Sequence, residues 1–272
     1  MIRQQKGDIH FLQFHHFSRF PGLKHFVSTR KGGISPPPFD SLNTSLKNDQ
    51  PDFVLENRKR LAQAVQISLE HFCFAQQCHG NQVSLVRQSD QGRGVYQYDQ
   101  GIAQTDALIT QSNNICLVVG SADCVPILLY APKARVIAAI HSGWRGTVKK
   151  ILSKTLELMI THHGAKPQEI LAGIGPCIAR NMYEIGEDVV KEVKNSFMDF
   201  ENLLYLNSES NKYHLDLKAA NLVQLQAHKI PLENIEISSY CTYEDSDLFF
   251  SYRRQKGKTG IFATGIMLDT SE

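Results

Sequence analysis

Three residues that are far apart in the chain carry side chains that commonly bind transition metals: His79, Cys124 and His141. Cys124 lies between two apolar runs, residues 115–120 and 125–130, which predict buried strands. His141 follows directly after a third run of this kind, and His79 lies in a polar turn. Side chains at strand ends can converge on a cleft while the sheet holds them rigid. These three residues are therefore the first candidate site.

Two imidazoles and one thiolate can hold a zinc ion and leave the fourth tetrahedral position for water or substrate. A zinc ion held in this way lowers the pKa of bound water toward neutrality and so supplies a nucleophile. The separations, 45 residues from His79 to Cys124 and 17 more to His141, match no local zinc motif. The spacing alone therefore leaves open whether the three side chains meet.

The same residues have two other interpretations. Cysteine is among the most buried residue types, so Cys124 can be a small core residue, with each histidine a hydrogen-bonded core side chain. Alternatively, Cys124 can act as a nucleophile with His141 as its base, which would be a thiol hydrolase that needs no metal.

Arginine residues supply the candidates for anion binding. Arg145 lies in a glycine-flanked turn just before an expected helix, where backbone N–H groups and a guanidinium can hold a phosphate together. Arg253 and Arg254 follow a run of aromatic residues and offer a second contact. Neighbouring strand residues point to opposite faces, so one of this pair is equally well interpreted as an ordinary surface residue. Trp144 either stacks on a planar ligand or packs in the fold.

The composition is that of a globular protein and excludes several classes of function. The 272 residues are 42% apolar and 21% charged, and the formal net charge is +2. A near-neutral chain of this kind lacks the basic surface that binds nucleic acid, and no uninterrupted apolar run reaches the 18 or so residues of a membrane span. A P-loop and a complete GxGxxG motif are also absent.

The N-terminal residues lack the apolar segment of a secretory signal, and the six cysteines have no paired CxxC spacing. These features predict free thiols in a reducing compartment. We therefore expect a cytoplasmic protein with neither a membrane nor a nucleic acid as its partner.

The order of the predicted elements indicates an α+β fold with a mixed sheet. Helices and strands follow one another without strict alternation, which argues against a doubly wound parallel fold. Fewer than about 40 residues precede the Gly- and Pro-rich segment 31–38, too few for a core of their own, so we expect one domain. The expected strands are 115–120, 125–130, 135–140, 170–174, 235–240 and 248–252, and the expected helices are 54–66, 147 to Gly164, 186–197 and 217–227, the last capped by Asp216.

Several segments together resemble one protein family in both sequence and order. The segments are Ser41-Leu42-Asn43, Gln77-Cys78-His79-Gly80-Asn81-Gln82-Val83, Thr105-Asp106-Ala107-Leu108-Ile109-Thr110, Ala122-Asp123-Cys124-Val125-Pro126, His141-Ser142-Gly143-Trp144-Arg145-Gly146, Gly175-Pro176-Cys177-Ile178, Cys241-Thr242 and Phe250-Ser251-Tyr252-Arg253-Arg254. They are similar to elements of the YfiH/YlmD-type laccase-domain proteins, formerly called polyphenol oxidases and now described as purine nucleoside phosphorylases. The similarity runs from about Ser28 to Leu268.

The resemblance implies a single-domain α/β/β/α sandwich over residues 1–272, with residues 1–27 as its N-terminal strands. It implies a zinc site, with copper as the alternative metal, at the positions of His79, Cys124 and His141. It also implies phosphorolysis of adenosine, inosine, guanosine and methylthioadenosine, together with hydrolytic deamination of adenosine. A zinc-activated water that attacks C6 of adenine fits this ligand set.

Further roles follow from the same resemblance. Asn43, Arg145 and Arg253 would bind substrate, and Asp123 and Arg145 would be catalytic, with Asp123 as an orienting group or proton carrier. The implied partners are purine nucleosides and phosphate, and the implied assembly is a monomer or a homodimer.

Two positions depart from the family pattern. Cys78 stands where relatives more often have an apolar residue, so a second thiol lies beside a candidate ligand. Ile261 stands where the family usually has an arginine, which removes one expected cation. Three other functions stay open from the sequence: a metal-free Cys-His hydrolase acting on amide bonds of cell-wall precursors, a copper-dependent phenol oxidase, and a nucleoside- or metal-binding regulatory protein.

Overall fold

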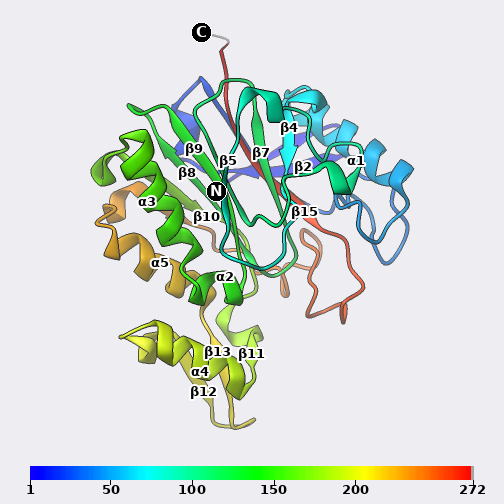
Figure 1. The fold of residues 1–272 in the computed structure, drawn as a ribbon. Helices are drawn as coiled ribbons and strands as arrows, with labels where there is room; N and C mark the ends of the chain where they lie inside the picture. Colours follow the sequence, from blue (N-terminus) through cyan, green and yellow to red (C-terminus); the bar gives the residue numbers. More distant parts are fainter. Residues whose placement is uncertain (271–272) are drawn as a thin grey trace.

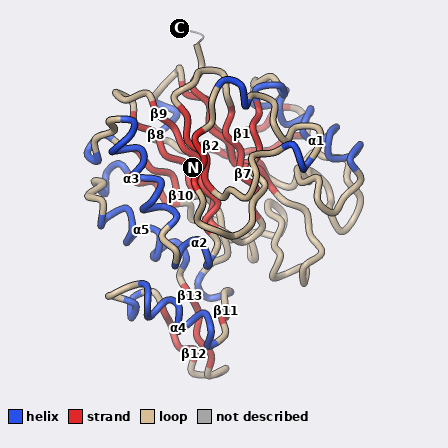
Figure 2. The backbone as a smooth tube through the Cα atoms, in the orientation of Figure 1, coloured by secondary structure: helices blue, strands red, loops and turns tan. Residues whose placement is uncertain are grey.

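The structure, a computed structural model, describes residues 1–270. Two six-stranded sheets lie face to face, with helix α1 (Pro51–Val65) on one outer side and helices α3 (Ile151–His163) and α5 (Leu217–Ala227) on the other (Figure 1). The tube in Figure 2 shows the same four layers, with the strands between the helices. This arrangement confirms the α/β/β/α sandwich. Within the described residues, every helix is too short or too polar to traverse the apolar part of a bilayer.

The first sheet contains the first and the last strand of the described residues. In spatial order its strands are β1 (Ile2–Lys6), β2 (Ile9–Gln13), β3 (Leu23–Ser28), β15 (Phe262–Leu268), β7 (Cys116–Ser121) and β4 (Phe72–Phe74). The pair β4 and β7 is parallel and the other neighbours are antiparallel, so the sheet is mixed. Residues 1–27 lie almost wholly in β1, β2, β3 and the turns between them.

The second sheet carries the candidate site. In spatial order its strands are β14 (Ile235–Ile237), β10 (Leu171–Ile174), β8 (Val125–Ala131), β9 (Val136–Ser142), β6 (Ala107–Thr110) and β5 (Val83–Leu85). The two outer pairs, β14 with β10 and β5 with β6, are parallel, and the central strands are antiparallel.

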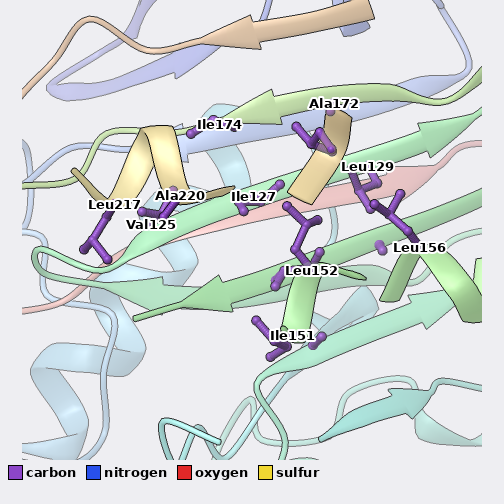
Figure 3. Packing of buried hydrophobic residues seen from close by; sticks show 14 of the residues in the cluster. Val125, Ile127, Leu129, Ile151, Leu152, Leu156, Ala172, Ile174, Leu217 and Ala220 are labelled. Atoms are coloured by element: carbon purple, nitrogen blue, oxygen red, sulfur yellow. The ribbon is translucent and has the colours of Figure 1, made fainter. Parts of the chain in front are cut away.

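The central strands are apolar throughout because both of their faces are buried. Leu128 of β8 belongs to the buried cluster between the two sheets. Its neighbours Ile127 and Leu129 pack under the helices with Leu152 and Leu156 of α3 (Figure 3). Each of these side chains is fully buried. A strand covered on both sides loses the polar alternation of a half-exposed strand, which explains the continuous apolar runs in the sequence.

A small lobe, residues 184–215, lies below the second sheet in Figure 1. It contains the third sheet, in the order β11 (Glu184–Ile185), β13 (Lys212–Leu215) and β12 (Leu204–Asn207), and helix α4 (Glu187–Ser196). Val189 and Val193 of α4 belong to the same buried cluster as the helices of the second sheet, so the lobe packs against the sandwich.

Most of the predicted elements are confirmed. The strands expected at 115–120, 125–130, 135–140 and 170–174 are β7, β8, β9 and β10, and the strand expected at 235–240 ends sooner, as β14. Asp216 caps α5 as expected, because its Oδ1 accepts the N–H of Ala219 at 2.9 Å.

Short 3-10 helices connect several elements: η1 (Phe17–Arg19), η2 (Leu69–His71), η3 (Gln88–Asp90), η4 (Tyr98–Gln100), η5 (Pro167–Glu169), η6 (Arg180–Met182), η7 (Phe200–Asn202) and η8 (Leu232–Asn234).

The single helix expected from residue 147 to Gly164 is wrong in one respect, since it is two helices. The first, α2 (Trp144–Val148), ends before Lys150, whose φ of 61° is left-handed and interrupts the helix before α3 begins. Gly164 does end α3, with a φ of 69°. The interruption lets α2 take its own direction at the end of β9.

Buried polar contacts hold α2 in that direction. The hydroxyl of Ser142 donates to Oδ1 of Asn221 on α5 at 2.9 Å, and the amide of Gln224 donates to the carbonyl of Thr147 at 3.2 Å. All four residues are buried, so each of these polar groups needs its partner. The turn after His141 is therefore fixed by two contacts with α5.

The strand expected at 248–252 is wrong, because this segment forms turns. Leu248, Phe249 and Phe250 are buried in the layer between the sheets without joining either one. The guanidinium of Arg254 donates to the carbonyls of Thr242 and Phe249 at 2.6 and 2.7 Å and so satisfies backbone groups that a sheet would otherwise pair. The apolar residues of this run therefore indicate burial and not a strand.

Candidate metal centre

Strand pairing brings Cys124 and His141 together at one end of the second sheet. Cys124 immediately precedes β8, and His141 is the second-last residue of β9. The two strands are antiparallel with Val125 opposite Ser142, so the residue that enters β8 lies beside the end of β9. His79 comes from the loop that leads into β5 on the far side of β6.

The structure places the three candidate ligands in one cluster. One ligand atom from each of His79, Cys124 and His141 lies within 4.8 Å of the other two. The two imidazole rings are 4.9 Å apart between centroids and nearly perpendicular, at 85°. His141 is buried, Cys124 is half-buried and His79 is exposed, so the cluster opens to solvent on one side.

The donor set fits a tetrahedral ion. With bonds of about 2.05 Å to nitrogen and 2.3 Å to sulfur, tetrahedral ligand atoms lie about 3.3 to 3.6 Å apart. The ligand atoms of the cluster lie at most 4.8 Å apart, and small side-chain movements would bring them to these distances. Catalytic zinc sites likewise use three protein ligands drawn from histidine, cysteine and carboxylate side chains and leave the fourth position open. The residues present therefore fit a zinc ion with one free coordination position.

Asp106 orients this cluster and was missed as a site residue in the sequence. Its carboxylate is fully buried; Oδ1 lies 2.8 Å from Nδ1 of His141 and accepts the N–H of His79 at 3.1 Å. Oδ2 accepts the N–H of Gly80 at 2.7 Å. The contact at Nδ1 leaves Nε2 of His141 as the free ligand atom. A signal was present, because an acid directly before the apolar strand 107–110 needs buried partners.

The charges in the cluster reinforce one another. Burial opposes ionisation of Cys124, but the charge and hydrogen bonds of His141 and His79 outweigh it and lower the pKa of the thiol. Burial likewise opposes protonation of His141, yet the charge of Cys124 and the hydrogen bond to Asp106 raise its pKa. Burial also disfavours the charged form of Asp106, but the hydrogen bond and charge of His141 lower the pKa of this carboxyl. The cluster thus favours a thiolate, which is the form that binds metals.

Cys78 lies outside the ligand cluster. Its exposed thiol contacts Oδ2 of Asp106 at 3.2 Å, and burial followed by this hydrogen bond raises the pKa of the thiol. Within residues 1–270, Cys124 supplies the thiol of the cluster.

Asp123 lies beside the cluster and ties two loops to it. Its φ of 98° is positive, and its Oδ1 accepts the hydroxyl of Thr242 at 2.6 Å while Oδ2 accepts the backbone N–H of Arg253 at 2.7 Å. Both carboxylate oxygens are therefore already hydrogen-bonded within the protein.

The two candidate arginines are both exposed near this end of the sheet. The guanidinium of Arg145 lies 4.3 Å from the ring centre of Trp144 on α2. Arg253 donates through one nitrogen to the carbonyl of Glu184 at 2.8 Å, and its guanidinium lies 5.1 Å from the ring of Tyr183. Each guanidinium retains N–H groups that can contact an anion.

Asn43 is placed differently, inside the loop that follows the Pro-rich segment. Its amide donates to the carbonyl of Ser45 and to Asp49, and its Oδ1 accepts the N–H groups of Ser45 and Ile261. The hydrogen bonds of Asn43 thus connect loops, and none of those described joins it to the three ligands. Ile261 packs against Gly120, because a Cβ added to Gly120 would lie 2.6 Å from Cγ2 of Ile261.

Gly143 is predicted to be essential for the cluster because it leaves room for the ligands. A Cβ at this position would lie 2.7 Å from Sγ of Cys124 and 3.4 Å from Cδ2 of His79. We expect Gly143→Ala to displace the thiolate and to lower zinc affinity about 10- to 100-fold, as when other groups that orient a ligand are lost. Competition with a chromophoric chelator measures this. Gly22→Ala is the control, because its Cβ would make an ordinary contact at 3.6 Å; equal affinities in both variants would contradict the prediction.

Comparison with known proteins assigns the fold and site to a family. The family model described as multi-copper polyphenol oxidoreductase laccase matches residues 24–269. The chain belongs to this family. The resemblance stated from the sequence is thereby confirmed for the laccase-domain family.

Curated and solved relatives cover almost the whole chain. The chain is 34% identical over 262 residues to a purine nucleoside phosphorylase of Bacteroides thetaiotaomicron, which covers 96% of this chain and 97% of that protein. It is 33% identical over 213 residues to adenosine deaminase RL5 from an unknown prokaryotic organism, which covers 78% of this chain and 81% of that protein. The crystal structure of YlmD from Geobacillus stearothermophilus matches with a TM-score of 0.92 and 33% identity, over 98% of this chain and 99% of that one.

Proposed function

We propose that this chain is a cytoplasmic, zinc-dependent purine nucleoside phosphorylase that also deaminates adenosine. The observation that carries the proposal is the cluster of His79, Cys124 and His141, whose ligand atoms lie within 4.8 Å of one another. The names of the laccase-domain relatives, purine nucleoside phosphorylase and adenosine deaminase, support the reaction types. The proposed substrates are adenosine, inosine, guanosine and methylthioadenosine, with phosphate as the second reactant.

The residues of the chain divide the work between two parts of the site. His79, Cys124 and His141 would hold zinc, which when bound supplies Lewis-acid chemistry that activates water near neutral pH. Arg145 and Arg253 would bind the phosphate that attacks C1′ of the ribose as the purine leaves.

Asp123 would hold the metal-binding part and the phosphate-binding part in a fixed relative position. It precedes Cys124 in the chain and accepts the backbone N–H of Arg253 at 2.7 Å, so it links a proposed metal ligand to a proposed phosphate ligand. Both carboxylate oxygens serve this positioning role, because each accepts a hydrogen bond.

Product analysis tests the proposal. Zinc-loaded protein incubated with adenosine and phosphate is expected to form adenine, ribose 1-phosphate and inosine, whereas without phosphate it forms inosine alone. Metal analysis of the purified protein identifies zinc or copper as the bound ion. Failure to form any of these products with full metal occupancy would contradict the proposal.

A second candidate function is supported by the charge pattern of the site. Cys124 with a lowered pKa, His141 beside it and Asp106 on the far imidazole nitrogen form the arrangement of a thiol hydrolase. Such an enzyme would act on amide bonds and need no metal. Treatment with a chelator separates the two functions, because it abolishes a zinc-dependent reaction and leaves a thiol hydrolase active.

A further inference from the structure

Tyr183 is a half-buried tyrosine with an unused hydroxyl at the junction between the sandwich and the small lobe. It follows η6, and its backbone carbonyl accepts the N–H of Leu215 on β13 at 3.1 Å, so its position is fixed. Its ring packs against the core cluster that includes α4. Among the described residues, no hydrogen bond involves its hydroxyl. This hydroxyl is not among the buried polar atoms that lack a partner, so it is open to solvent and can donate to a ligand.

The contacts of Tyr183 place it beside the candidate site. The guanidinium of Arg253 lies 5.1 Å from the centre of its ring, and the backbone N–H of Arg253 donates to Asp123 at 2.7 Å. Asp123 is the chain neighbour of Cys124. A continuous series of contacts thus connects the tyrosine to the proposed metal ligand.

The charges that act on Tyr183 agree with this location. Burial raises the pKa of its phenol, and the negative charges of Cys124 and Asp123 raise it further, whereas the positive charges of Arg253 and Arg145 oppose them. The hydroxyl therefore stays protonated and can donate a hydrogen bond. Of the two arginines that we assign to phosphate, Arg253 contacts the Tyr183 ring directly.

We propose that the hydroxyl of Tyr183 is a phosphate-binding group that completes a subsite with Arg145 and Arg253. This inference rests on the proposed function and adds a binding residue to it. Phosphate is the reactant that matches the three groups, because it is anionic and rich in acceptors while all three residues donate. Two carboxylates near the subsite already have partners: Glu184 pairs with Lys212 at 2.8 Å, and Asp123 accepts hydrogen bonds from Thr242 and from the backbone N–H of Arg253.

The subsite would serve only one of the two proposed reactions. Phosphorolysis requires a bound phosphate, whereas deamination of adenosine requires water and no anion. Loss of the Tyr183 hydroxyl should therefore weaken phosphorolysis and spare deamination, a separation that a merely structural role would not produce.

Tyr183→Phe tests the inference, since it removes the hydroxyl and keeps the ring that contacts Arg253. We expect the dissociation constant of inorganic phosphate, measured by calorimetric titration of the zinc-loaded protein, to rise about 10- to 100-fold, the usual effect of losing one hydrogen bond to a charged group. The KM for phosphate in phosphorolysis should rise by the same factor. Zinc content and phosphate-free deamination should stay within twofold of the wild type.

Tyr205→Phe is the matched control. Tyr205 lies in the same lobe on β12 and also contacts an arginine, Arg180, at 5.4 Å, but it is exposed on the lobe surface. Unchanged phosphate affinity in Tyr183→Phe, or a wild type that binds no phosphate, would overturn the inference. Weakened phosphate binding without any phosphorolysis by the wild type would instead overturn the proposed function and support the subsite.

Discussion

Cys124→Ala is expected to remove the metal from the protein and to abolish both proposed reactions. The thiolate is one of three ligands, and two imidazoles alone cannot provide the charge or the geometry of the intact site. Loss of the Lewis acid removes several kcal/mol of transition-state stabilisation, which corresponds to about a 10³-fold or larger fall in kcat/KM. Elemental analysis after dialysis and assays with adenosine, with and without phosphate, measure both effects.

Cys78→Ala is the matched control for this variant. Cys78 carries an exposed thiol in the loop of His79 but lies outside the ligand cluster, so this change should leave the zinc content near that of the wild type. Circular dichroism verifies that both variants remain folded. Equal metal content in Cys124→Ala and the wild type would show that the thiol is not a ligand.

The sequence predicts the strands of this site well because their residues are apolar on both faces. Cys124 and His141 stand at the ends of such runs, which identifies them as candidates before any coordinates. Their meeting cannot be read from the sequence, since it depends on the antiparallel pairing of β8 with β9. The contribution of His79 depends in addition on β6, which lies between β9 and β5 in the sheet.

Other features depend on tertiary packing that a linear pattern does not contain. The run from Leu248 to Phe250 is apolar because it is buried between the sheets, and the side chain of Arg254, not a neighbouring strand, pairs its backbone. The split between α2 and α3 occurs at Lys150, a residue type with no intrinsic preference for the left-handed region. Tyr183 is distant in sequence from both arginines that act on it.

Asp106→Asn is expected both to weaken metal binding and to destabilise the fold. The carboxylate accepts hydrogen bonds from backbone N–H groups of the His79 loop and contacts Nδ1 of His141. An asparagine has only one acceptor oxygen. Its NH2 group would replace the other carboxylate oxygen and would face donors that this oxygen accepts in the wild type. Because Asp106 and His141 are buried, the mismatch leaves the amide in poor contact with its donors and His141 without its orienting charge.

We expect this variant to bind zinc about 10- to 100-fold more weakly and to lose about 3–5 kcal/mol of unfolding free energy. Chelator competition and urea unfolding of the metal-free protein measure the two effects separately. Asp99→Asn makes the same chemical change at an exposed position in η4 and should alter neither quantity.

Since the pKa of Asp106 is lowered in the folded state, its contribution to stability is present at neutral pH and is lost as the pH falls. The stability difference between wild type and Asp106→Asn should therefore shrink in acid, and a difference that grows there would contradict the role of its charge.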